Sequence, residues 1–220
     1  VGRLCGDFVV MSSPKLHNVG ALSGAAAVSV APCRERITGL EAKTGCYQVR
    51  FAATTRDLVR AQDLRWRAFR AGRGASETVG RDVDAFDAIC RHVLVEERQT
   101  GRPVAAFRLL PLADGSEIDR SYSAQYYGLS ALAAYPRKMV EMGRFCLDPD
   151  CHAADVLRVA WGAMPRLVED ESVGMLFGCS SFVGTYAESY TDAVAMPRAC
   201  PLAPSLSVAT VLPPSLCLLS

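Results

Sequence analysis

Two charged side chains lie inside a run of residues that otherwise has the pattern of a buried strand. The segment "MVEMGRFCLDPD", residues 139–150, is largely apolar but carries Glu141 and Arg144. Charged side chains are rarely buried unless they are paired. Because the two residues are three positions apart, a regular strand would turn them to opposite faces. Gly143 between them predicts a β-bulge, which would turn a carboxylate and a guanidinium toward one polar site.

Two further arginines fall on surfaces that the hydrophobic pattern assigns to the core. In a helix over residues 56–70, Arg65 lies in the middle of the apolar arc, opposite the other arginines of the segment. In the strand pattern "PVAAFRLLP", Arg108 shares a mainly apolar face whichever way the strand is turned. Each therefore needs a buried partner or a ligand. The alternatives are a guanidinium that snorkels past the core edge at Arg65 and an edge strand at Arg108.

Acidic partners for these arginines are available in the segment "DVDAFDAICRH". Asp84 and Asp87 are three residues apart in it and share one face if the segment is helical. Together with Glu141, they would balance several arginines inside an apolar fold, as a site for a charged small molecule requires. A purely structural ion network would have the same pattern, so the charges alone leave both interpretations open.

The composition limits the classes of function. The chain has 220 residues, of which 50% are hydrophobic and 21% charged, as is typical of one globular core. A net charge of +1 gives no overall field for nucleic acid. The nine cysteines are scattered without a CxxC pair, so we expect thiols in a reducing compartment. Only Cys146, Cys151 and His152 come near the sequence spacing of metal ligands. No second cluster completes a set of four ligands, so we predict no metal site.

The central part of the chain contains the periodic segments that must position these side chains. The expected order is strand, helix, three strands, helix and strand, at residues 47–54, 56–70, 92–97, 103–110, 139–150, 153–169 and 174–182. Thr55 is the expected N-cap of the first helix. Pro165 lies inside the second helix, which we therefore expect to kink or end nearby. This order predicts a mixed α/β sheet in one domain.

The two ends of the chain lack this periodicity. Residues 1–45 are expected to form a loose extension. After Ala193 only Arg198 is charged and prolines recur, so we interpret residues 191–220 as a disordered or frameshifted tail that does not pack into the core. An ordered loop that wraps the core is the alternative.

Several of these segments together resemble a known family. The chain resembles the L-ornithine Nα-acyltransferases of bacterial ornithine lipid synthesis, which belong to the GNAT acyltransferase superfamily and are related to acyl-homoserine-lactone synthases. The resemblance implies a GNAT-like single domain over residues 46–190 that lacks its C-terminal strands. It covers about residues 47–186 and rests on "AQDLRWRAF", "DVDAFDAICRHVLVEE", "TGRPVAAFRLLP", "YSAQYYGLSAL", "MVEMGRFCLDPD" and "MLFGCSSFVGT".

The resemblance also implies a reaction. The family passes a 3-hydroxyacyl group from acyl carrier protein to the α-amine of ornithine, which gives lyso-ornithine lipid. A carboxylate must take the amine proton, with Glu141 as the first choice and Asp84 or Asp87 as the next. Backbone N–H groups of the bulged strand would supply the oxyanion donors. The residues expected to bind substrate, which also fit the framework of the lactone synthases, are Arg65, Phe69, Arg108 and Arg144.

The expected acyl donor is acyl carrier protein, with its phosphopantetheine thioester as co-substrate and no other cofactor. CoA-dependent relatives usually carry a Gly-rich pyrophosphate loop before the main helix, where this chain has "DPDCHAAD". We expect a cytoplasmic enzyme, and a peripheral contact with the inner face of the membrane stays open. The residues expected to dock the acidic carrier are the exposed arginines of the first helix: Arg56, Arg60, Arg67 and Arg70.

Two other functions fit parts of the sequence. An acyl-homoserine-lactone synthase would share the fold and use S-adenosylmethionine in place of ornithine, but "LFGCSSF" and "YSAQYYGLSAL" favour the ornithine enzyme. A nucleic-acid-binding module could use the arginines of residues 56–73. The near-neutral net charge and the acidic segment 77–97 argue against it.

Overall fold

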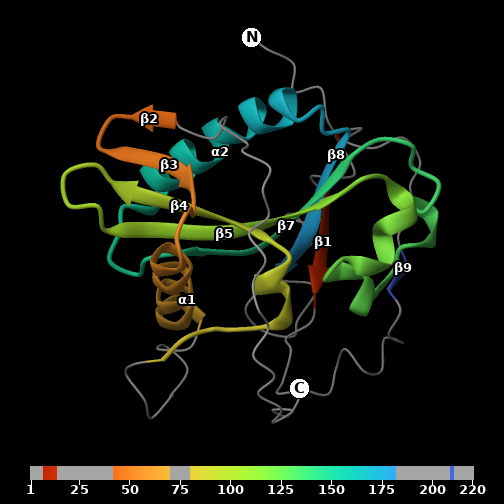
Figure 1. The fold of residues 1–220 in the computed structure, drawn as a ribbon, viewed down its shortest axis with the longest axis horizontal. Coiled ribbons are helices and arrows are strands. Elements are labelled where there is room, and N and C mark those ends of the chain that lie inside the picture. Colours follow the sequence, from red (N-terminus) through yellow and green to blue (C-terminus); the bar gives the residue numbers. More distant parts are fainter. Residues whose placement is uncertain (1–6, 14–41, 70–79, 182–208, 211–220) are drawn as a thin grey trace, which may run out of the picture.

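A seven-stranded mixed sheet forms the centre of the fold (Figure 1). The computed structural model describes residues 7–13, 42–69, 80–181 and 209–210. In order across the sheet, the strands are β1 (Asp7–Ser13), β8 (Met175–Ser181), β7 (Met139–Leu147), β5 (Pro103–Leu112), β4 (Arg91–Glu97), β3 (Tyr47–Phe51) and β2 (Ala42–Thr44). β8 pairs in parallel with both β1 and β7, and the other neighbours are antiparallel. The predicted mixed α/β sheet is confirmed.

Two α-helices cover opposite faces of this sheet. α2 (Ala153–Asp170) packs on the face that carries Val93 and Phe107, whereas α1 (Thr55–Phe69) packs on the face that carries Leu94 and Ala106. The α1 face continues under a region of short elements: η1 (Ala85–Ala88), η2 (Gly115–Arg120), η3 (Ser123–Gln125), η4 (Ser130–Leu132), β6 (Tyr127–Gly128) and β9 (Ala209–Thr210). Among the described residues, no helix combines the length and apolarity needed to cross a membrane.

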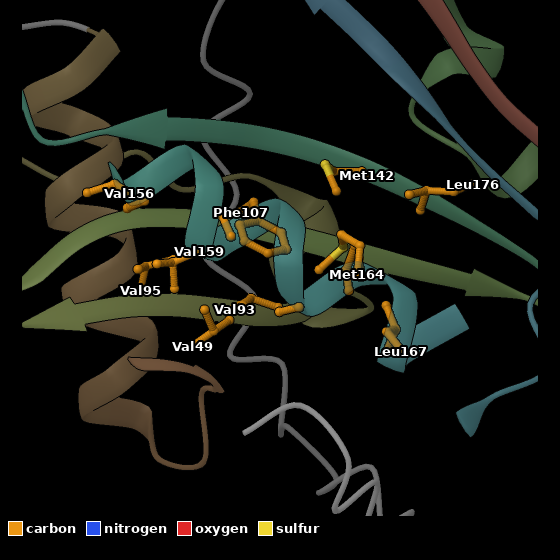
Figure 2. Packing of buried hydrophobic residues seen from close by; sticks show 14 of the residues in the cluster. Val49, Val93, Val95, Phe107, Met142, Val156, Val159, Met164, Leu167 and Leu176 are labelled. Carbon is orange, nitrogen blue, oxygen red and sulfur yellow. The ribbon is translucent and has the colours of Figure 1, made fainter. Parts of the chain in front are cut away.

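The larger hydrophobic core lies between α2 and the sheet. Figure 2 shows Val156, Val159, Met164 and Leu167 of α2 facing buried side chains of the sheet, among them Phe107. Burying each such side chain contributes about 1.5–3 kcal/mol. The helical spacing of the apolar residues in α2 and their alternation along the strands therefore fix which faces meet.

Helix α1 begins at a hydrogen bond to Thr54. The backbone N–H of Asp57 donates to the Thr54 hydroxyl oxygen at 3.1 Å, so the N-cap side chain is Thr54, one residue before the expected Thr55. Ala61 and Leu64 then pack on the sheet. Arg65 beside them is only 1% exposed, which excludes a snorkelling guanidinium.

Helix α2 runs through Pro165 without ending. The sequence predicts a kink or an end near this residue, but the helix continues to Asp170, so an end at Pro165 is wrong. The proline costs the helix one backbone hydrogen bond. Because Ala163, Met164 and Leu167 on either side are buried in the core, their packing holds the last turn in place.

Parts of both chain ends have regular structure. Within the expected loose extension 1–45, β1 pairs along its whole length with β8, and β2 pairs with β3, so the expectation is wrong for these residues. Within the expected tail, β9 pairs with β6. The backbone groups of a strand edge are satisfied by another strand whatever its side-chain pattern, which explains why periodicity missed these pairs. Apart from Gly45, the rest of both regions lies outside the described residues.

Strands β7 and β8 pair only at their beginnings. Their pairing runs from Met139 opposite Met175 to Met142 opposite Gly178, after which the two strands diverge (Figure 1). A Cβ at position 178 would lie 2.2 Å from the carbonyl oxygen of Met142, so only glycine permits this close crossing. Beyond Met142, therefore, no described strand pairs with the edge of β7 that faces β8.

Candidate active site

A β-bulge in β7 turns Glu141 and Arg144 to the same side of the sheet. Where β5 advances by two residues, from Ala106 to Arg108, its partner β7 advances by three. Arg144 has a φ of 53°, the left-handed conformation found in some bulges. Both side chains reach Tyr122: its N–H donates to the Glu141 carboxylate, and its ring centroid is 5.9 Å from the Arg144 guanidinium carbon. The predicted bulge and shared face are confirmed.

Arg65 is the centre of a buried ion network on the α1 face. Its Nε donates to the Asp82 carboxylate at 3.0 Å, and its two terminal nitrogens donate to the two oxygens of Asp87, both at 2.8 Å. The Gln62 amide donates to the same Asp87 carboxylate at 3.0 Å. This bidentate geometry holds Asp87 in one orientation, and it favours a positioning role for Arg65.

Arg108 extends the network across the sheet. Its terminal nitrogens donate to the two oxygens of Asp84 at 2.6 and 2.9 Å, and one of them also donates to Asp87 at 3.0 Å. β5 lies between β4 and β7, so the edge-strand alternative for Arg108 is wrong. The backbone carbonyl of Asp87 lies 3.1 Å from His92 Nε2, which supports the same segment from β4.

Arg144 and Asp84 form the open end of this network. The Arg144 terminal nitrogen donates to Asp84 at 3.0 Å, whereas its Nε is 3.6 Å from Asp82, too far for a hydrogen bond. Among the described residues this Nε has no hydrogen-bond partner. The side chains of Arg144 and Asp84 are 30% and 23% exposed. We call the whole set the inner ion cluster: Arg65, Asp82, Asp84, Asp87, Arg108 and Arg144.

Glu141 lies beside the inner ion cluster and is held by the start of η3. The backbone N–H groups of Tyr122 and Ser123 donate to its two oxygens at 2.8 and 2.7 Å, and the Ser123 hydroxyl donates to Oε1 as well. The residue is only 4% exposed. A carboxylate has about four acceptor positions, so this arrangement fixes Glu141 while leaving it able to take a proton.

The three candidate bases differ in the direction of their pKa shifts. Burial alone would raise the pKa of Asp84, but hydrogen bonds from Arg108 and Arg144 outweigh it and lower that pKa to about 2. Burial would also raise the pKa of Asp87, but the hydrogen bonds and positive charge of the Arg65 guanidinium outweigh this effect, so that the pKa is lowered. For Glu141 burial prevails and raises the pKa, despite the bonds from Ser123 and Tyr122. Of the three, Glu141 alone has a pKa shifted in the direction that makes a carboxylate a better proton acceptor.

Phe69, which the resemblance implies is a substrate-binding residue, lies at the open end of the cluster. Its ring centroid is 6.0 Å from the guanidinium carbon of Arg144. Two residues of the site, Asp82 and Ser123, were not predicted from the sequence. Asp82 pairs with Arg65, and its position two residues before Asp84 in "RDVDAFD" was an available signal. Ser123 bonds to Glu141 from 18 residues away, and no local pattern indicates such a contact.

The arginines of α1 are less free than the sequence suggests. Arg60 donates to the Glu96 carboxylate at 2.6 Å, and Arg67 lies 3.2 Å from the buried carboxylate of Asp148. Arg56 is exposed, and Arg70 lies outside the described residues. Arg60 and Glu96 belong to a second group of ion pairs near the start of α1. We call this group the outer ion cluster: Arg50, Asp57, Arg60 and Glu96.

The start of α2 is acidic. Asp148 is buried in the preceding turn, where it accepts hydrogen bonds from Arg102 at 3.1 Å and from the N–H of Asp150 at 3.0 Å. Asp155 lies in the first turn of the helix, and His152 at the N-cap makes no side-chain capping bond. A helix N-terminus favours anions, but these carboxylates already occupy that environment and would repel a pyrophosphate.

Comparison with known proteins agrees with the predicted resemblance. Residues 64–162 match a family described as "Acetyltransferase (GNAT) domain". L-ornithine N(alpha)-acyltransferase of Rhodobacter capsulatus is 32% identical over 149 residues, which cover 63% of this chain and 58% of that protein. The protein of the same name from Brucella abortus is 30% identical over 154 residues, covering 64% and 55%. The chain therefore spans a little over half the length of these relatives.

The solved structures to which the chain is similar include the AHL synthase LasI. The TM-score is 0.47 at 15% identity, over 74% of this chain and 89% of that one. Glucosamine-6-phosphate N-acetyltransferase from Arabidopsis thaliana has a TM-score of 0.38 at 8% identity, over 73% and 96%.

Proposed function

Starting from the similarity to L-ornithine N(alpha)-acyltransferases, we propose that this protein is an N-acyltransferase. It transfers a 3-hydroxy fatty acyl group from acyl carrier protein to the α-amine of ornithine, and its product is lyso-ornithine lipid. One observation carries this proposal: a carboxylate with a raised pKa, Glu141, and the open end of the inner ion cluster lie on the same face of β7. Acylation of a charged amino acid requires both a base and fixed charges that hold the substrate.

Glu141 acts as the base in this reaction. The α-amine attacks the thioester carbonyl, and the nitrogen must then lose a proton before the amide forms. Asp84 and Asp87 are held ionised by arginines, so they are weak proton acceptors and serve to orient the cluster. The raised pKa of Glu141 matches the task.

Arg144 binds the carboxylate of ornithine. It is the most exposed arginine of the inner ion cluster, with a side chain that is 30% exposed, so a substrate carboxylate can approach its guanidinium from the solvent side. The aromatic rings of Phe69 and Tyr122 flank its guanidinium, so the donors point in a restricted direction. Asp84 on the other side would attract the side-chain ammonium of ornithine.

The acyl thioester enters where β7 and β8 stop pairing. Beyond Met142 the backbone of β7 has no described strand on its β8 side, so an extended arm with amide groups can pair with it as an added strand. The N–H groups of the bulge around Gly143 and Arg144 then face the thioester oxygen and stabilise the oxyanion. The acidic start of α2 favours a carrier-bound arm over CoA, because it lacks groups for a pyrophosphate.

The direct test is acyl transfer by the purified chain. We expect it to convert 3-hydroxyacyl carrier protein and L-ornithine to the Nα-acyl product, detected by mass spectrometry. S-adenosylmethionine in place of ornithine should give no acyl-homoserine lactone. Lactone formation would instead assign the chain to the synthase reaction, and no transfer to either amine would overturn the proposal.

The role of Glu141 has its own test. Glu141→Gln should lower kcat by ~10²-fold because the side chain loses its basicity, while circular dichroism remains that of the parent. Glu96→Gln is the matched control, since Glu96 is an equally buried glutamate of the outer ion cluster. It should lose stability and keep kcat. Equal kcat values for the parent and Glu141→Gln would remove Glu141 from this role.

A further inference from the structure

A chain of three side chains leads from Glu141 to β8. The Ser123 hydroxyl oxygen lies 2.5 Å from Glu141 Oε1 and 2.9 Å from the sulfur of Cys179. Ser123 is fully buried and Glu141 nearly so, whereas Cys179 is half-buried. Cys179 is therefore the more accessible end of the chain, and the proposed mechanism has not used it.

The direction of these hydrogen bonds follows from the donors available. An ionised carboxylate only accepts, so the single hydroxyl proton of Ser123 goes to Glu141. The contact between Ser123 and Cys179 then needs the thiol as its donor. Burial raises the pKa of Cys179 to about 11, so the sulfur keeps its proton. Before the reaction, the Cys179 thiol therefore donates to the Ser123 hydroxyl oxygen, and the Ser123 hydroxyl donates to the Glu141 carboxylate.

Cys179 also lies at the point in the sheet where the acyl thioester is proposed to enter. It follows Gly178, the residue at which β7 and β8 stop pairing, and it packs with Phe177 on the same face as Glu141. Because both ends contact the same serine oxygen, the carboxylate and the sulfur are close enough to serve two substituents of one carbonyl carbon. Once the α-amine has added to the thioester placed in this gap by the proposed function, the tetrahedral adduct would present its nitrogen substituent to Glu141 and its sulfur substituent to Cys179.

We propose that Cys179 is the general acid that protonates the departing thiolate, and that Ser123 relays a proton to it from Glu141. This inference rests on the proposed acyltransferase reaction and assigns two further residues to it. Ser123 does not contact the substrate and is a positioning and relay residue. Cys179 contacts the leaving sulfur and is catalytic.

Each proton that moves during the acyl transfer has a donor and an acceptor. The neutral amine forms the C–N bond, and the resulting ammonium nitrogen gives one proton to Glu141. The C–S bond then breaks, and the departing sulfur takes the thiol proton of Cys179. Ser123 gives its hydroxyl proton to the Cys179 sulfur and receives the proton held by Glu141. The protein returns to its resting state, and no oxidant, metal or covalent intermediate takes part.

The test uses two acyl donors that differ in their need for an acid. A 3-hydroxyacyl N-acetylcysteamine thioester releases a basic alkyl thiolate, whereas the matching thiophenyl ester releases a weakly basic one that departs without a proton. With the full chain and L-ornithine, Cys179→Ala should lower kcat by ~10²-fold on the alkyl ester and by less than about threefold on the phenyl ester. Ser123→Ala should show the same selectivity to a smaller degree.

The ratio of the two rates keeps this test independent of folding, since a partly unfolded preparation lowers both rates equally. Cys179→Ser, with nearly the same volume, should restore part of the rate on the alkyl ester. Cys151→Ala, in the turn before α2, is the matched control and should leave both rates unchanged. An equal loss on both esters would mean a structural role for Cys179 and overturn the inference. No turnover by the parent with either ester or with 3-hydroxyacyl carrier protein would instead overturn the acyltransferase proposal, and this inference with it.

Discussion

The two ion clusters beside α1 contain similar residues but differ in how completely the protein satisfies them. In the outer ion cluster, near the start of the helix, Arg50 donates from all three of its nitrogens to Asp57 and Glu96. Arg60 adds bonds to Glu96 and to the backbone of Gly101. The two arginine side chains are 25% and 27% exposed, so both ends of the network touch solvent.

The inner ion cluster, near the end of the same helix, is closed at one end and open at the other. Arg65 and Arg108 are 1% and 3% exposed and bind their acids on several sides. Arg144 is 30% exposed, and within the described part of the chain its buried Nε has no hydrogen-bond partner. A network built only for stability has no reason to leave a donor unpaired on a strained bulge. The comparison therefore favours a scaffolding role for the outer cluster, and it supports the proposed substrate binding at the open end of the inner one.

The largest expected difference between the clusters is in stability. Arg65→Met should lower the free energy of unfolding by about 3–5 kcal/mol, because Asp82 and Asp87 would remain buried without their counter-charge. Arg60→Met, on the same helix, should cost about 1 kcal/mol or less, because solvent reaches that pair. Urea denaturation at constant m-value measures both. Equal losses would show that burial does not separate the two networks.

The next effect is the response to acid. The carboxyl of Asp84 protonates at about pH 2 when folded and near 3.8 when unfolded. The unfolded chain therefore takes up the proton first, so this stability is present above pH 3.8 and is lost as the pH falls toward 2. Asp84→Asn should remove about 2 kcal/mol of this pH dependence, as measured by urea denaturation between pH 4 and pH 2.

Asp57→Asn is the variant of the outer ion cluster that corresponds to Asp84→Asn in the inner one. Hydrogen bonds from Arg50 lower the pKa of Asp57 further than that of Asp84, so Asp57→Asn should also flatten the acid response. It should leave turnover unchanged, whereas Asp84→Asn should lower it. If neither variant changes turnover, the open end of the inner cluster does not bind the substrate.

The smallest expected effect tests substrate binding at the open end. Arg144→Lys should raise KM for ornithine about tenfold, or about 1.4 kcal/mol, because an ammonium cannot reproduce the planar donors of the guanidinium. Arg50→Lys in the outer cluster should leave KM unchanged. Steady-state kinetics with saturating acyl donor gives both values. A rise in KM for Arg50→Lys of similar size would place the effect in the scaffold and contradict the comparison.

Local patterns in the sequence identified much of the inner ion cluster. Arg65 and Arg108 stood out because the helical and alternating periods place them on apolar faces, and burial of both is confirmed. Gly143 between two charges predicted the bulge, because only an extra residue brings both to one face. The same reasoning failed at Pro165, where tertiary packing outweighs the local cost of an interior proline.

The sequence by itself determined the two α-helices and the central strands, their buried faces and the surplus of charge that those faces carry, since each depends on neighbours within a few residues. Only the tertiary structure decided which charges meet. Ser123 contacts Glu141 across 18 residues and Cys179 across 56, and β1 pairs with β8 from the opposite end of the chain. Such contacts depend on strand order and register, and no short-range period encodes them. The tertiary structure likewise separates the pKa values of the three candidate bases, because the surrounding arginines lower those of Asp84 and Asp87, whereas burial raises that of Glu141.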